Sequence, residues 1–264
     1  MNRKLFAVAV IASLAGAGAM AATQLPPLRG GRFKPLAETE MTPEQKAMAE
    51  AVVAGPRSGL NGPFNVLLRS PDLGDRLQRV GEYVRFKTSL PPRLNELAIL
   101  VTARAWTAQY EWYAHHALAL KAGLPPAICD DIAAGRRPAK MEKDEEAIYT
   151  FTRELIDTKH VSDATFNAVK EKFGERGVVD LIGLIGYYHT VSMVLNVDGY
   201  PLPDGAQPEL QPINYSPHRA PVPGGARCGR RHRRSDGGSW YRRPPLSFQV
   251  PRCAPSAGRR APRS

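Results

Sequence analysis

Apolar side chains recur at intervals of three and four residues from about residue 41 to 200, the spacing of one helix face. Thr42, Pro43 and Gln45 form a helix-start signal before the first of these runs, and Gly55 follows its end. The predicted helices lie between residues 42 and 55, 70 and 90, and 92 and 106, then at 107–122, 126–134, 144–158, 163–173 and 178–197. In the second of these helices the apolar spacing falls on Leu73, Leu77, Val80 and Val84.

Strict alternation of apolar and polar residues, the pattern typical of strands, is missing from this region. We therefore predict an all-α fold, a single multi-helix domain over residues 23–210. Its last helix, residues 178–197, is apolar on nearly all sides but contains Asp180, His189 and Asn196, which are costly in a bilayer. A helix of this kind is expected in the centre of the domain or between subunits rather than across a membrane.

The two ends of the chain differ in composition from this domain. Asn2-Arg3-Lys4 precedes an apolar run of about 15 residues and an Ala19-Met20-Ala21 cleavage pattern, which together indicate a secretory signal peptide over residues 1–22. That run is shorter than the roughly 20 residues of a membrane-spanning helix, so cleavage is favoured over an anchor. We expect an exported protein without a membrane span, periplasmic in a Gram-negative source.

Charge is concentrated in a C-terminal tail, residues 211–264, which is rich in Arg, Pro and Gly and is predicted to be disordered. Residues 217–264 contain 12 of the 36 basic residues and one of the 25 acidic residues, so the rest of the chain is electrically balanced. Two interpretations remain open: an arm that binds nucleic acid or an anionic surface, or an out-of-frame product of GC-rich DNA. All 12 basic residues of this stretch are Arg and none is Lys, which favours the out-of-frame interpretation. We therefore do not expect nucleic acid to be a partner.

Cysteine use excludes two classes of protein. Cys129 is the one cysteine of the predicted helical domain, and no Cys-x-x-Cys pair occurs anywhere in the chain. A disulfide scaffold and a redox pair of that type are therefore ruled out for the domain. Asp130 and Asp131 follow Cys129 and are expected to raise its pKa, which disfavours a reactive thiolate.

The residues best suited to chemistry are Glu96, Glu111 and His115. Glu111 and His115 are four residues apart on one predicted helix and so share a face. A carboxylate beside an imidazole favours the imidazolium and orients it for proton transfer near neutral pH. Glu96 lies on the preceding helix and completes the cluster if the two helices pack as a hairpin. An exposed salt bridge is the alternative interpretation of such a pair. His116 points about 100° away and is expected to make a structural hydrogen bond.

Residues 94–123, together with Gly62-Pro-Phe-Asn-Val-Leu-Leu-Arg69 and residues 186–196, resemble the carboxymuconolactone decarboxylase family over about residues 41–202. The resemblance implies an all-helical, alkylhydroperoxidase D-like bundle that forms symmetric oligomers, trimers or hexamers. The redox branch of this superfamily carries Glu-x11-Cys-x2-Cys-x3-His, and that pattern falls here on Glu96, Ala108, Glu111 and His115. Both cysteines are replaced, so peroxidase activity is the less favoured alternative. Residues 110–112 and the following His are similar to the decarboxylase branch.

The resemblance implies a carboxy-lyase that acts by acid/base chemistry on a small carboxylated lactone or a related carbonyl acid. His115 would donate the proton, with Glu111 orienting it and Glu96 in support. We predict neither a cofactor nor a metal, because the His-Glu-x-x-His pattern is absent. Because enzymes of this type normally work in the cytoplasm, export leaves the substrate open. The residues predicted to bind substrate are Arg93, Arg104, Tyr110, Trp112 and His189.

Overall fold

The predicted helices are present, and no strand occurs among the residues that the computed structural model describes, 25–57 and 59–212. The proposed signal peptide and the tail beyond residue 212 lie outside these residues. The all-α prediction is therefore confirmed for the described part of the chain. The elements are η1 (Glu38–Glu40), α1 (Pro43–Ala54), α2 (Phe64–Leu67), α3 (Pro71–Phe86), α4 (Pro92–Trp106), α5 (Gln109–Lys121), α6 (Pro126–Ala133), α7 (Lys143–Thr158) and α8 (Asp163–Asp198).

Local backbone and side-chain geometry marks the start of α1 and the end of α4. The Thr42 side chain accepts a hydrogen bond from the Gln45 amide at 3.3 Å, and the Gln45 side chain accepts one from the Thr42 amide at 2.9 Å. This capping box satisfies two amides that the first turn of α1 leaves free. Thr107 ends α4 in the left-handed region, with φ 48°, which allows α5 to fold back against α4. The short elements η1 and α2 were not predicted, because three or four residues carry no helical period.

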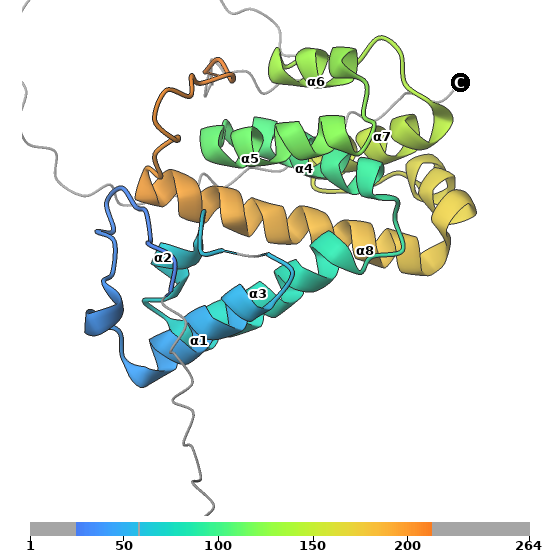
Figure 1. Ribbon diagram of the computed structural model, residues 1–264. Helices are drawn as coiled ribbons and strands as arrows, with labels where there is room; N and C mark the ends of the chain where they lie inside the picture. The colour runs from blue at the N-terminus through green and yellow to red at the C-terminus, as the bar shows by residue number, and fades with distance from the viewer. Residues whose placement is uncertain (1–24, 58, 213–264) are drawn as a thin grey trace, which may run out of the picture. The chain divides into compact units, whose positions relative to one another are not determined.

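The last helix, α8, runs through the centre of the described domain and packs against α3 on one side and α4, α5 and α7 on the other (Figure 1). Gly174 breaks its regular geometry with φ 69° and separates the two helices predicted at 163–173 and 178–197. By length and composition this is one helix able to cross a membrane, although more than half of its apolar stretch is buried among other helices. The contacts confirm the prediction of a central helix.

The buried face of α3 differs from the predicted one. Leu73 and Val80 are 53% and 46% exposed, whereas Gly74 and Gly81 on the neighbouring face are buried. Gly74 lies so close to Met48 that an added Cβ would meet its sulfur at 2.6 Å, and Gly81 lies equally close to Tyr187. Small residues on α3 thus allow α1 and α8 to approach. Leu73 and Val80 face outward, whereas Val84 is buried as predicted and Leu77 is half-buried.

Candidate active site

The turn between α4 and α5 brings Glu96, Glu111 and His115 together. Nδ1 of His115 lies 2.7 Å from Oε2 of Glu96, and Nε2 lies 3.2 Å from Oε1 of Glu111. All three residues are buried, with exposed fractions of 4–8%. The interpretation as an exposed salt bridge is wrong, because two carboxylates hold one imidazole inside the protein.

The electrostatics of this cluster favour the imidazolium form of His115. Burial alone lowers the pKa of His115, but the charges of Glu96 and Glu111 and their hydrogen bonds outweigh it and raise the pKa to about 9. Both ring N–H groups then donate, one to each carboxylate. The site therefore stores a proton on His115 at neutral pH.

A cavity of about 290 Å³ opens onto one side of this cluster. Glu111 and His115 line it, whereas Glu96 lies behind the imidazole and does not. Tyr110 from α5 and Tyr188 from α8 add aromatic walls, and the Tyr188 ring lies edge-on to His115 with centroids 5.0 Å apart. The cavity has the size of a small organic ligand, with its proton donor at one wall.

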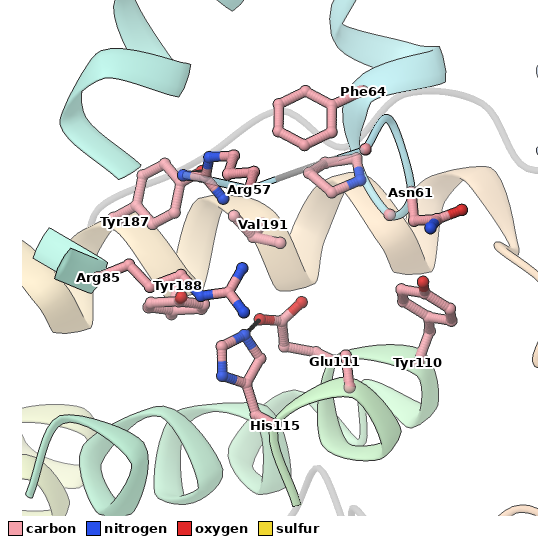
Figure 2. Close-up of a pocket in the computed structure, with 14 residues that line it drawn as sticks. Arg57, Asn61, Phe64, Arg85, Tyr110, Glu111, His115, Tyr187, Tyr188 and Val191 are labelled. Carbon is pink, nitrogen blue, oxygen red and sulfur yellow. Dashed lines mark hydrogen bonds and ion pairs between the residues drawn. The ribbon is translucent and has the colours of Figure 1, made fainter. Parts of the chain in front are cut away.

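Two arginines that the sequence analysis did not single out reach the same cavity. Arg57 and Arg85 point into the space above Glu111 and His115 (Figure 2). Arg57 donates to the Tyr187 hydroxyl at 3.3 Å, and its Nε is buried without a hydrogen-bond partner. Neither guanidinium forms an ion pair with any carboxylate among the described residues. Both are therefore available to an anionic ligand.

The two arginines predicted to bind substrate lie elsewhere. Arg93 pairs with Asp144 at 2.8 Å and with the buried Glu145, so its charge is already neutralised within the fold. Arg104 donates to the Gln211 carbonyl at 2.8 Å. Neither side chain lines the cavity, because Arg93 reaches α7 and Arg104 reaches Gln211. Sequence spacing could not distinguish these arginines from Arg57 and Arg85.

Of the three aromatic and imidazole groups predicted to bind substrate, only Tyr110 lines the cavity. Trp112 is fully buried and its Nε1 donates to Glu209 at 2.8 Å. His189 accepts a hydrogen bond from Trp106 Nε1 at 2.5 Å on another face of α8. Successive side chains along an α-helix are rotated by about 100°, so neighbours of a site residue in sequence need not share its face.

The histidine after His115 has the structural role that was expected. Nδ1 of His116 lies 2.7 Å from Oε2 of Glu209, the same oxygen that accepts from Trp112. Leu210, the next residue, exchanges hydrogen bonds with the Gln109 side chain. These contacts hold Glu209 and Leu210 against the side of α5 that faces away from the cavity.

The one cysteine within the described residues has no catalytic environment. Cys129 is buried in the core, and burial, together with the charge of Asp130, raises the pKa of its thiol to about 11. It does not line the cavity. Among the described residues no group of three His, Cys, Asp or Glu side chains is arranged to hold a metal ion.

Comparison with known proteins agrees with this architecture. Residues 71–147 match the model of the carboxymuconolactone decarboxylase family, a span that includes α4, α5 and the whole Glu96–Glu111–His115 cluster. This segment of the chain is therefore similar to the domain of that family.

Among solved structures, the chain is similar to a crystal structure of an alkylhydroperoxidase AhpD core, an uncharacterized peroxidase-related protein from Ralstonia eutropha JMP134. The identity is 16%, the TM-score is 0.55, and the match covers 66% of this chain and 92% of that chain. This likeness shows an AhpD-like fold. No curated protein matches the sequence.

Proposed function

We propose that the protein is a carboxy-lyase that removes CO2 from a small carboxylated lactone or a related unsaturated carbonyl acid. The observation that carries this proposal is a buried imidazolium between two carboxylates, beside a cavity lined by two arginines that form no ion pair with any described residue. Such a site combines a proton donor for carbon with a binding site for a carboxylate.

Each residue has a separate part in the proposed reaction. Arg57 and Arg85 hold the substrate carboxylate and orient it in the cavity. When the bond to CO2 breaks, its electron pair stays on the carbon and is delocalised toward the lactone carbonyl. The Nε2 proton of His115 is then transferred to that carbon, which leaves a neutral imidazole whose Nδ1–H still donates to Glu96. Glu111 orients the ring before the transfer by accepting the Nε2–H hydrogen bond, and this bond forms again when solvent returns the proton to His115.

The arginine assignment is tested by kinetics on a panel of carboxylated lactones, followed by loss of ultraviolet absorbance. Arg57→Gln and Arg85→Gln are each expected to raise KM by about 10–100-fold, the effect of losing one charge-assisted hydrogen bond of about 1.5–3 kcal/mol. Arg76→Gln is the matched control, since this residue lies on α3 with Arg85 but is 73% exposed in its side chain. It should leave KM unchanged.

Two results would contradict the proposal. Equal KM values in the three arginine variants would remove the carboxylate-binding role of the cavity. Peroxide consumption with a dithiol reductant, abolished by Cys129→Ser, would favour the thiol peroxidase alternative instead. Such activity is not expected, because a buried thiol with a raised pKa is a poor nucleophile.

We also propose that the protein is a homo-oligomer in which a second copy covers an exposed apolar face of α8. Val179, Ile182, Met193 and Val197 are 66%, 49%, 41% and 56% exposed, and their spacing places them on one side of the helix. Light scattering should give a mass above 29 kDa for the native chain and a lower mass for Ile182→Lys. A native monomer in dilute buffer would contradict this proposal.

A further inference from the structure

A second group of cations lies on the other side of α4, away from the candidate active site. Arg104 occupies the last turn of α4 and is only 6% exposed. No carboxylate among the described residues forms an ion pair with it. A buried charge without a counter-charge is costly, and Arg104 accordingly has a lowered pKa, through burial and then the charge of Arg153.

One edge of the Arg104 guanidinium is free. Nη1 is used, since it donates to the Gln211 carbonyl at 2.8 Å and lies 3.5 Å from the Thr107 hydroxyl. Nε is buried without a partner, and no described residue accepts a hydrogen bond from Nη2. The Nε and Nη2 groups point in parallel, which is the geometry that binds both oxygens of a carboxylate or phosphate.

The space in front of this free edge is kept open by a glycine. Gly135 follows α6 with φ 73°, a left-handed conformation that disfavours residues with a side chain. A Cβ built on Gly135 would lie 3.6 Å from Nη2 and 3.8 Å from Nε of Arg104. The two free donors therefore face the position that a side chain at residue 135 would occupy.

Arg136, Tyr149 and Arg153 line the same cavity, which has a volume of about 40 Å³. Arg136 is balanced by Asp131 at 2.7 Å and Arg153 by Asp157 at 2.8 Å, so the unbalanced charge belongs to Arg104. Burial raises the pKa of Tyr149, which keeps its hydroxyl protonated and able to donate. One water needs roughly 10–15 Å³ on this measure, so the space fits a small anion and not an organic substrate.

We propose that this cavity binds one small oxyanion, a carboxylate or phosphate group, on the Nε and Nη2 edge of Arg104. The anion neutralises the buried guanidinium. It also links α4 to the C-terminal end of α6, which Gly135 and Arg136 follow, and to α7, which contains Arg153. The site is separate from the cavity of Glu111 and His115 and does not depend on the proposed reaction. A simpler role for Arg104, as a helix-end cation that caps α4 and holds Gln211, requires no bound anion.

Calorimetric titration of the full chain with inorganic phosphate, and separately with acetate, at constant ionic strength tests the site. The expected result is a saturable binding event of one anion per chain that is retained in Arg85→Gln, together with a rise in Tm. The phosphate and acetate arms show which oxyanion is preferred. Arg104→Gln is expected to weaken binding by about tenfold or more. Because Arg104 is buried, Arg153→Gln provides a second variant on the rim of the same cavity, with a similar expected loss.

Two controls make the result specific. Arg137→Gln removes a neighbouring exposed arginine that pairs with Glu146 and does not line this cavity, so it should bind phosphate as the native chain does. Arg85→Gln removes a cation of the candidate active site and should also retain this binding event. Absence of saturable binding by the native chain would overturn the proposal. So would equal affinity in Arg153→Gln and Arg137→Gln, or loss of the binding in Arg85→Gln.

Discussion

Replacement of His115 by Ala is expected to lower turnover of a carboxylated lactone by about 10²–10⁴-fold, the usual contribution of general acid catalysis. His115 holds the proton that the reaction transfers to carbon, and no other protonated imidazole lines the cavity within the described residues. Glu111→Gln should lower turnover less than His115→Ala does, because an amide still orients the ring but no longer stabilises its positive charge.

His116→Ala is the matched control on the same helix. Its side chain is 23% exposed, contacts Glu209 and lies outside the cavity, so turnover should change little. Circular dichroism of each variant verifies that helicity is intact. An equal loss of turnover from His115→Ala and His116→Ala in folded proteins would mean that the assigned helix face is wrong.

The pH profile gives an independent measure of the same group. The pKa of His115 rises from an ordinary value of 6.5 to about 9 in the folded protein, so the folded state holds this proton more tightly. Its contribution to stability is therefore complete below about pH 6.5 and is lost as the pH rises through about 9. Turnover that needs the imidazolium should decline over the upper part of the same range, and Glu111→Gln should move the decline to lower pH.

Trp112→Ala is expected to lower the free energy of unfolding by about 3–5 kcal/mol, the usual cost of emptying a large aromatic site in a core. Trp112 is fully buried, and its indole N–H donates to Glu209. The substitution leaves a cavity under α5 and also removes one of the two side chains that hold Glu209 against this helix.

Trp106→Ala is the comparison, because this indole is 37% exposed and donates to His189 near the surface. Trp106→Ala should lower the free energy of unfolding by less than half as much as Trp112→Ala. Denaturant unfolding followed by circular dichroism, at equal chain concentrations for all variants, measures both values. Similar losses for the two tryptophans would contradict the assignment of Trp112 to the core.

The candidate cluster was predictable because its members are tied by local geometry. Glu111 and His115 share a helix face through their spacing alone, and Glu96 joins them once a short turn folds α4 onto α5. The turn itself consists of Thr107 and Ala108, so the two helices must be neighbours. Local spacing therefore determined which groups meet, although it did not determine that Glu96 stands behind the imidazole and Glu111 at the cavity.

The groups around the cluster were not predictable in the same way. Arg57 comes from the segment after α1 and Arg85 from α3, and both reach the cavity only because α3 packs along α8. The chain holds many arginines, and nothing in their local sequence separates the two that face the cavity from Arg93, which a carboxylate pair neutralises. Whether residues far apart in sequence meet depends on long-range packing, which a short stretch of sequence does not determine.

The sequence by itself determined the longer helices, the capping box of α1 and a buried place for the apolar part of α8, because hydrophobic spacing and capping act within a few residues. Only the tertiary structure decided which face of each helix is buried. On α3 the glycines face inward and Leu73 and Val80 outward, since close approach to Met48 and Tyr187 leaves no room for larger side chains. The same long-range packing selected the arginines of the cavity and left one edge of Arg104 free beside Gly135.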